Sequence, residues 1–244
     1  MTGAALKTSM LDFSRFEWLS FDCYGTLIDW ETGLLGYLRP LLESQGRALS
    51  DAQILNLYSE FEPHAQSGPY RYYREVLAQV VRDFARELRF SVSAADADGL
   101  AESIRGWQPF ADTVPALRRL QSRYKLAVLS NIDDDLFACT APKLAVGFDA
   151  VVTAQQVHSY KPSFNNFEAL LRRFKIPRER LLHVAESLYH DVVPAHALEI
   201  ATVWVNRRQG KEAAASKLVE AHPDLEVLDI GKLAELAVPE GWRV

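Results

Sequence analysis

The chain has 244 residues, of which 48% are hydrophobic, and its 27 basic and 32 acidic residues give a formal net charge of −5. This length and apolar content suffice for one large domain, or for a core with a smaller inserted domain. The charge balance argues against a nucleic-acid-binding protein, which needs a basic face, and apolar runs of only strand length argue against a membrane-spanning protein.

Residues 1–12, MTGAALKTSMLD, contain one lysine and no long apolar stretch. They predict a loose N-terminal tail and not a secretory signal peptide. The chain has only two cysteines, Cys23 and Cys139, which make no disulfide framework. A reduced, cytoplasmic protein is therefore expected.

The first strand is expected at residues 15–22, and the pattern from residue 30 to residue 107 is helical. Pro40 should kink or divide the first helix of this stretch, and Ser50 should cap the second. Because no strand pattern interrupts these helices, we expect an all-helical insertion. Its expected helices cover residues 33–46, 51–65, 70–90 and 94–107.

After residue 109, strands and helices alternate, which indicates right-handed crossovers and a parallel sheet with helices on both faces. The strands are near-continuous apolar runs, as burial on both faces requires. Pro142 should break the second of these helices. The expected strands are 125–131, 148–155, 180–187 and 201–207, and the expected helices are 113–124, 134–146, 165–174, 191–198 and 228–237.

Polar side chains follow several of the expected strands at the point where each strand ends. In an open α/β sheet, ligands bind beyond the carboxyl ends of the strands. Each residue alone has a common structural explanation as a turn residue, a helix cap or a solvated side chain. Their arrival together at one end of one sheet favours a catalytic site. The residues are Asp22, Ser130, Asn131, Lys161, Glu186, Ser187 and Asp191.

Four segments carry a resemblance to a known family: DCYGTL at 22–27, LSN at 129–131, YKP at 160–162 and AESLYHD at 185–191. In order and spacing they resemble the four motifs of the haloacid dehalogenase (HAD) superfamily. The resemblance implies an α/β fold with a Rossmann-like three-layer core and a parallel sheet. It further implies an inserted all-helical C1-type cap. The implied domains are the core, residues 13–29 and 109–244, and the cap, residues 30–108.

The resemblance also implies roles for individual residues. Asp22 would be the nucleophile that forms a covalent aspartyl intermediate, and Lys161 would neutralise charge beside it. Tyr24, Thr26, Ser130, Asn131 and Ser187 would bind the substrate or the leaving group.

The chemistry of these residue types fits that assignment. A desolvated carboxylate aimed at an electrophile can form an ester intermediate. A nearby ammonium such as Lys161 lowers the pKa of Asp22 and keeps it ionised at neutral pH. Asp191 would orient or deprotonate the water that hydrolyses the ester.

Tyr24 indicates which electrophile is attacked. Phosphatases of the superfamily carry a second Asp at this position, which protonates the leaving oxygen, whereas a phenol with a pKa of about 10 is a poor proton shuttle at neutral pH. L-2-haloacid dehalogenases carry the same Tyr, and their halide leaving group needs no proton. The sequence therefore favours substitution at carbon, with simple packing as the alternative role of Tyr24.

Three positions depart from the dehalogenase pattern. Glu186 stands where those enzymes have Ser, and Phe167 stands where they have Tyr. Their cap arginine has no counterpart in residues 54–63, so that Arg71 or Arg74 would have to replace it.

Glu186 and Asp191 also resemble the acid pair with which superfamily phosphatases hold Mg²⁺. We expect no cofactor. In the alternative, a Mg²⁺-dependent phosphatase, the ion would bind Asp22, the Tyr24 backbone, Glu186 and Asp191. A second alternative is a non-catalytic HAD-fold binding protein.

The four segments resemble those of azetidine-2-carboxylate hydrolase still more closely. That enzyme opens a strained cyclic amine, and its leaving nitrogen must carry a proton. Glu186, if burial holds it protonated, is the candidate donor. The expected substrate is a small 2-substituted carboxylic acid. No nucleic-acid or membrane partner is expected, and a homodimer is compatible with the sequence. His183 and the charged run at 206–212 are expected to be structural and solvated, respectively.

Overall fold

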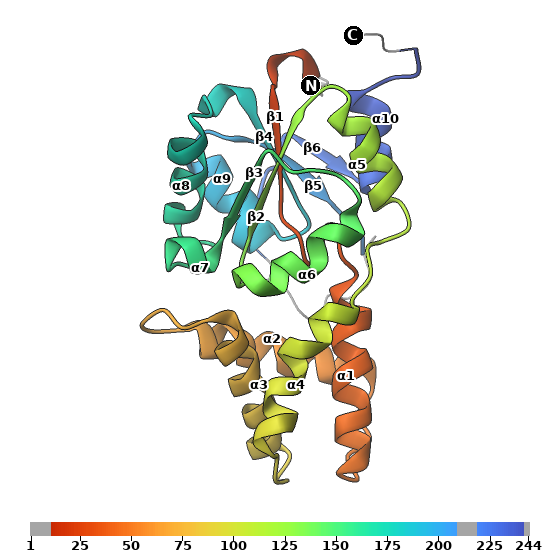
Figure 1. The fold of residues 1–244 in the computed structure, drawn as a ribbon, viewed down its shortest axis with the longest axis vertical. Helices are drawn as coiled ribbons and strands as arrows, with labels where there is room; N and C mark the ends of the chain where they lie inside the picture. The colour runs from red at the N-terminus through yellow and green to blue at the C-terminus, as the bar shows by residue number, and fades with distance from the viewer. Residues whose placement is uncertain (1–10, 209–218, 242–244) are drawn as a thin grey trace, which may run out of the picture.

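The computed structural model describes residues 11–208 and 219–241, and the tail expected at 1–12 lies almost entirely outside them. The chain forms a sheet with flanking helices and a separate group of helices below it (Figure 1). Among the described residues, no helix has the length and apolar character needed to span a bilayer.

The sheet has six parallel strands in the order β3-β2-β1-β4-β5-β6. Residues on alternate faces of β1, such as Trp18 and Leu19, are both buried. Double-sided burial of this kind explains the near-continuous apolar strands and confirms the predicted α/β fold. The strands are β1 (Trp18–Phe21), β2 (Lys125–Ser130), β3 (Ala150–Thr153), β4 (Leu181–Ala185), β5 (Ala201–Val205) and β6 (Leu225–Val227).

Helices cover both faces of the sheet, α5, α6 and α10 on one side and α8 and α9 on the other (Figure 1). Short helical turns precede β1 and β4 and follow α4, β3 and β4. The core helices are α5 (Thr113–Gln121), α6 (Asp134–Leu144), α7 (Ala154–Val157), α8 (Phe164–Phe174), α9 (Val193–Ala197) and α10 (Ile230–Ala237). The single turns are η1 (Phe13–Arg15), η2 (Ile104–Gly106), η3 (Arg178–Arg180) and η4 (Leu188–Val192).

Four helices form the group below the sheet. They pack around a shared apolar interior, and the amphipathic pattern of α3 is the clearest of the four. The two connections to the sheet run side by side, because Ile28 pairs with Pro109 and the Asp29 amide donates to the Gln108 carbonyl. The helices are α1 (Trp30–Ser44), α2 (Asp51–Gln66), α3 (Tyr73–Glu87) and α4 (Ala94–Ser103). The division of the chain into two domains, at 29/30 and at 108/109, stays a prediction.

The expected division of a helix at Pro40 or Pro142 is wrong, whereas a kink at Pro40 stays a prediction. Pro40 lies inside a continuous α1, where it and Gly36, the residue whose carbonyl it leaves unpaired, are both exposed to solvent. Water can therefore bind the unpaired carbonyl. Pro142 lies in the last turn of α6, and the helix ends only at Leu144.

Three strand predictions also differ from the structure. The strand expected at 148–155 ends at Thr153, because the Thr153 hydroxyl accepts the Gln156 amide and starts the turn α7. Residues 13–15 form the helical turn η1, so that β1 begins only at Trp18. Strand β6, three residues long, was not predicted.

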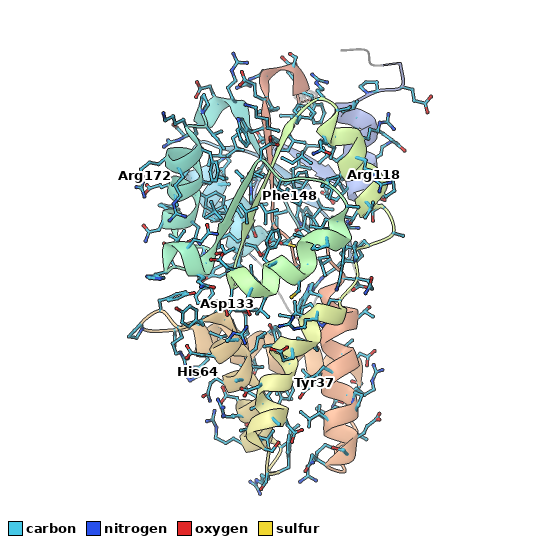
Figure 2. The ribbon with its side chains drawn as sticks, viewed as in Figure 1. Tyr37, His64, Arg118, Asp133, Phe148 and Arg172 are labelled. Carbon is cyan, nitrogen blue, oxygen red and sulfur yellow. The ribbon has the colours of Figure 1, made fainter. Side chains whose placement is uncertain are left out.

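One polar side chain ties the helical group to the core. Asp133, at the start of α6, accepts the backbone amides of Tyr73 at 2.8 Å and Arg74 at 2.9 Å. Figure 2 shows Asp133 at the boundary between the core and the group of four helices. The carboxylate satisfies amides at the N-terminus of α3, where negative charge is favoured. This contact fixes α3 relative to the edge of the sheet.

Two glycines of α1 provide a matched test of packing in the helical group. A Cβ at Gly33 would lie 2.3 Å from the Trp107 ring, whereas a Cβ at Gly36 would meet nothing within 4 Å. We expect Gly33→Ala to lower the free energy of unfolding by about 1–3 kcal/mol through overpacking. Gly36→Ala should raise it by up to about 1 kcal/mol through helix propensity. Urea unfolding measures both, and equal shifts in the two variants would contradict the packing around Trp107.

Candidate active site

The ends of the three central strands bring the expected polar residues together. β1 lies between β2 and β4, so Asp22, Ser130 and Glu186 leave the sheet at the same edge. From β1 the chain first adds β2 and β3 on one side and then β4, β5 and β6 on the other side. The carboxyl end of β1 is therefore next to the topological switch point, where α/β proteins bind ligands.

Lys161 joins the two central carboxylates. Its Nζ donates to Asp22 Oδ1 at 2.9 Å, to Asp191 Oδ1 at 2.6 Å and to the Leu129 carbonyl at 2.8 Å. Only 2% of Lys161 is exposed. All three ammonium protons therefore have partners, as a buried charge requires.

The loop after β1 holds the other oxygen of Asp22. Thr26 Oγ1 donates to Asp22 Oδ2 at 2.9 Å and accepts the Glu186 amide at 2.9 Å. Gly25 turns this loop with φ +101°, a conformation that favours glycine, and a Cβ there would lie 3.0 Å from Trp30 Nε1. Both the positive φ and the close approach of Trp30 therefore explain why the motif has glycine at position 25.

Charge and burial shift the pKa values of the two carboxyls in opposite directions. Burial raises the pKa of Asp22, Lys161 lowers it, and the net shift is upward. Lys161 lowers the pKa as predicted, but burial and Asp191 outweigh it; that Asp22 is ionised at neutral pH stays a prediction. Burial also acts to raise the pKa of Asp191, but Lys161 and His183 more than offset burial and hold that pKa at about 2. Burial acts to lower the pKa of Lys161, but Asp191 and Asp22 outweigh burial and raise it.

Two residues expected to bind substrate make their side-chain hydrogen bonds within the protein. Asn131 accepts the Lys161 amide at 2.7 Å and donates to the Lys161 carbonyl at 3.0 Å, so it clamps the loop that carries the lysine. Ser187 Oγ accepts the His190 amide at 3.1 Å and caps η4. Ser130, at the end of β2, is buried and lines the pocket.

Tyr24 lines the pocket with its ring and not with a free hydroxyl. Its OH lies 2.8 Å from Thr140 Oγ1, and its ring packs edge-on against Trp107. Burial raises the pKa of Tyr24 well above the ordinary value. The side chain is therefore poorly suited to proton transfer at neutral pH.

Glu186 has a cation as its partner. Its carboxylate lies 3.2 Å from Arg208 Nε, and Arg208 also contacts Glu31. Burial raises the pKa of Glu186 to about 7, although Arg208 lowers it. At neutral pH the group is thus partly protonated.

These residues line a small pocket of about 110 Å³ between the sheet edge and the helical group. The helical group supplies the aromatic wall and one carboxyl, Glu62. The lining residues are Asp22, Tyr24, Trp30, Tyr58, Glu62, Tyr73, Ile104, Trp107, Ser130, Asn131, Ile132, Lys161, Glu186, Ser187, His190, Asp191 and Arg208.

The prediction that Arg71 or Arg74 replaces the dehalogenase cap arginine is wrong, because neither residue lines the pocket. Arg71 contacts the Ala65 carbonyl, and Arg74 contacts Asp135. The pocket arginine is Arg208, which follows β5.

Residues 206–212 were expected to be solvated, but their described part includes two pocket-supporting arginines. Arg207 is largely buried, where it binds Asp112 with two hydrogen bonds and the Thr26 carbonyl at 2.8 Å. Arg208 lines the pocket itself. Their place after a parallel strand was the signal that the sequence contained, because it is the same signal that identified Asp22.

Glu62 was also missed, since it lies on a helix whose orientation the sequence does not reveal. Its Oε1 accepts Gln66 Nε2 at 2.7 Å and the Tyr73 hydroxyl at 3.3 Å. Burial raises the pKa of Glu62 to about 7. Among the described ion pairs, the other pocket carboxylates have a cation beside them, whereas Glu62 has none.

The residues fit a Mg²⁺ ion poorly. The ammonium of Lys161 occupies the position between Asp22 and Asp191, and Glu186 is paired with Arg208. Within residues 11–208 and 219–241, no three His, Cys, Asp or Glu side chains are grouped to hold a metal ion.

The fold and the site define an α/β protein in which a group of four helices faces a sheet edge that carries two buried carboxyls and a buried lysine. The family model of haloacid dehalogenase-like hydrolases matches residues 17–198. The chain therefore belongs to the haloacid dehalogenase-like hydrolase family.

Individual relatives are similar over nearly their whole length. (S)-2-haloacid dehalogenase H-109 from Pseudomonas putida is 25% identical over 222 residues, 90% of this chain and 96% of the relative. The structure of L-2-haloacid dehalogenase from Xanthobacter autotrophicus with covalently bound chloropropionic acid has a TM-score of 0.76 at 17% identity, covering 93% of this chain and 100% of that one. The HAD-hydrolase YfnB from Bacillus subtilis, bound to magnesium, has a TM-score of 0.75 at 17% identity, covering 91% and 99% of the two chains.

Removing the central ammonium tests the electrostatics of the site. We expect Lys161→Met to lower the free energy of unfolding at neutral pH by about 3–5 kcal/mol, because two buried carboxylates lose their counter-charge. In the native protein the pKa of Asp191 lies at about 2, below the ordinary 3.8, so its ionisation stabilises the fold above about pH 4, and this contribution is lost as the pH falls towards 2.

In the variant burial dominates, both carboxyl pKa values rise, and the stability deficit should shrink as the pH falls from 7 and the carboxylates protonate. Urea unfolding between about pH 4.5 and 7.5 measures the deficit. Lys232→Met, which removes an exposed ion pair, is the control and should change stability by less than about 0.5 kcal/mol. A deficit that grows on acidification would contradict this account.

Proposed function

We propose that the protein hydrolyses small 2-substituted carboxylic acids by nucleophilic substitution, with Asp22 as the nucleophile and an aspartyl ester as the intermediate. One observation carries the proposal: Asp22 lines a small pocket while Lys161 and Thr26 each fix one of its carboxylate oxygens. The similarity to (S)-2-haloacid dehalogenases supports the substrate class. The L-2-haloacid dehalogenase with covalently bound chloropropionic acid supports a covalent intermediate.

In the first step a carboxylate oxygen of Asp22 attacks the substituted carbon. The bond from that carbon to the leaving group breaks, and its electron pair goes to the leaving group. Lys161 and Thr26 restrict the rotation of the carboxylate, which reduces the entropy lost on reaching the transition state.

In the second step water attacks the carbonyl carbon of the Asp22 ester. Asp191 supports this step, because its Oδ2 is buried and has no described hydrogen-bond partner, while Lys161 and His183 occupy Oδ1. Oδ2 takes a proton from the water and passes it to the departing alkoxide. The alcohol leaves, and Asp22 is regenerated as a carboxylic acid. It then releases the second proton of the water to solvent and regains its negative charge.

The surroundings of Tyr24 support carbon over phosphorus as the reacting centre. A phosphoryl transfer needs a proton donor for the leaving oxygen, and the Tyr24 hydroxyl is turned to Thr140 and has a raised pKa. We propose that turnover needs no metal, in agreement with the lysine that already bridges the two carboxylates. The Mg²⁺-dependent phosphatase remains the alternative to test.

Two observations favour a strained amine over a halide as the leaving group. The carboxyl of Glu186 keeps its proton up to about pH 7, so it can keep a departing nitrogen protonated. The pocket carboxyl of Glu62, without a described cationic partner, complements an N–H of an amine. Both agree with the resemblance to azetidine-2-carboxylate hydrolase in the motif segments. A cytoplasmic location and a homodimer rest on the sequence alone and belong to the same proposal.

Heavy-oxygen water tests the nucleophile directly. With the enzyme in excess over 2-chloropropionate or azetidine-2-carboxylate, we expect one heavy oxygen in the Asp22 carboxyl after a single turnover, because water attacks the ester carbonyl. Mass spectrometry of the peptide that contains Asp22 measures the label.

Asp22→Asn is the control and should lose turnover while remaining folded, which also separates an enzyme from a binding protein. The same assays run with EDTA, and with p-nitrophenyl phosphate as substrate, test the phosphatase. An unlabelled Asp22 in an active enzyme, or phosphatase turnover that EDTA abolishes, would overturn the proposal.

The pH profile separates the two leaving groups. Ring opening needs protonated Glu186, so its kcat/KM should fall above about pH 7, the pKa of that group, whereas halide displacement should show no such fall. The acid limb of both reactions should lie above the range of an ordinary Asp, because the pKa of Asp22 is raised and its ionised form is the nucleophile.

Glu186→Gln should reduce ring opening by about 10²–10⁴-fold and leave halide displacement little changed. Full ring-opening activity in this variant would remove Glu186 from the mechanism.

A further inference from the structure

Two buried side chains inside the sheet, next to the pocket, take no part in the reaction described above. Ser20 on β1 and His183 on β4 are fully buried and are paired by the register of the two strands. Ser20 Oγ lies 2.8 Å from His183 Nδ1, and His183 Nε2 lies 2.9 Å from Asp191 Oδ1. Strand pairing therefore extends the hydrogen-bond chain of the active site into the core of the sheet.

The chemistry of Asp191 sets the direction of these hydrogen bonds. Lys161 and His183 hold the pKa of Asp191 at about 2, so the group is ionised and only accepts hydrogen bonds. The imidazole must then donate from Nε2. Nδ1 lies within hydrogen-bond distance of the Ser20 hydroxyl, so the ring is held at both of its nitrogens.

His183 and Lys161 both donate to one oxygen of Asp191. Two donors on Oδ1, at 2.9 Å and 2.6 Å, fix the plane of the carboxylate and leave Oδ2 buried without a described partner. Phe167 packs its ring edge-on against His183 at 5.0 Å and prevents the imidazole from turning. The residue that departs from the dehalogenase pattern at 167 thus supports the histidine.

We propose that His183, held by Ser20, is a positioning residue for hydrolysis of the aspartyl ester. It directs Asp191 Oδ2 towards the water that attacks the Asp22 carbonyl. The inference rests on the proposed function, since it concerns the second of its two steps.

The first step does not need this arrangement. Attack on the substrate requires ionised Asp22, which Lys161 and Thr26 hold without His183. Once Asp22 is a neutral ester, Asp191 alone balances Lys161, and Asp191 must then accept a proton from water. Loss of the His183 donor lets the carboxylate rotate towards Lys161, so that Oδ2 turns away from the water.

Resolving the two steps tests the inference. In His183→Leu we expect ester formation at nearly the native rate and ester hydrolysis slowed by about 10- to 100-fold, by analogy with the loss of a hydrogen bond that orients a metal-binding side chain. Rapid quenching followed by intact-protein mass spectrometry should show the substrate-bearing protein accumulate. His183→Gln, whose amide can replace the Nε2 donor, should restore much of the hydrolysis rate, and Ser20→Ala should slow the same step more weakly.

Thr202→Val is the matched control. Thr202 is buried and pairs with His183 from β5, on the side opposite Ser20, and its hydroxyl contacts Asp224 and not Asp191. It should leave both steps unchanged. If His183→Leu does not fold, His183→Gln and Ser20→Ala carry the test alone.

The outcomes separate the inference from the function on which it rests. Equal slowing of both steps, or a hydrolysis rate unchanged in His183→Leu and Ser20→Ala, would show a purely structural histidine while heavy oxygen still labels Asp22. An active enzyme that never labels Asp22 would instead overturn the proposed function, and the inference with it.

Discussion

A buried ammonium between two buried carboxylates is the interaction on which the site depends. Removing each of these charges from water costs several kcal/mol, and mutual attraction repays this only when every donor has a partner. Lys161 meets that condition with Asp22, Asp191 and the Leu129 carbonyl. Three strand ends and the loop before α8 must therefore be in place together before Asp22 has its counter-charge.

The neighbouring contacts are best understood as support for this interaction. Asn131 clamps both peptide groups of Lys161, so a residue expected to bind substrate mainly fixes the lysine. Thr26 links Asp22 to the backbone of Glu186, and Arg207 holds the Thr26 carbonyl. Each contact joins segments that are distant in the sequence. The described side-chain hydrogen bonds of Asp22 consequently come from the core alone.

The cap gives the pocket a character of its own. It contributes aromatic rings and Glu62, while the cations of the pocket, Lys161 and Arg208, come from the core. Asp133 fixes the start of α3, and with it Tyr73, over the sheet edge. A fold shared across a family does not define the reaction. The proposed preference between leaving groups rests instead on individual side chains: Tyr24 and Glu186, together with Glu62 across the pocket.

The fold class and the residues at the strand ends were predictable from the amino-acid sequence, because both follow from local patterns. Alternating apolar runs and helices predict a parallel sheet, and such a sheet brings Asp22, Asn131 and Glu186 to one edge whatever the details of packing. The sequence did not predict β6, which is too short to give a pattern. It also misplaced the end of the third expected strand, where the side chain of Thr153 caps a turn.

The pKa values of the site carboxyls and the orientations of the side chains around the pocket were not predictable from local patterns. The pKa of Asp22 depends on the balance between burial and Lys161, and no local pattern contains that balance. Helix orientation turned Glu62 towards the pocket and Arg74 away from it, and strand register placed His183 against Ser20. These features arise from contacts between residues far apart in the chain, and such contacts exist only once the chain has folded.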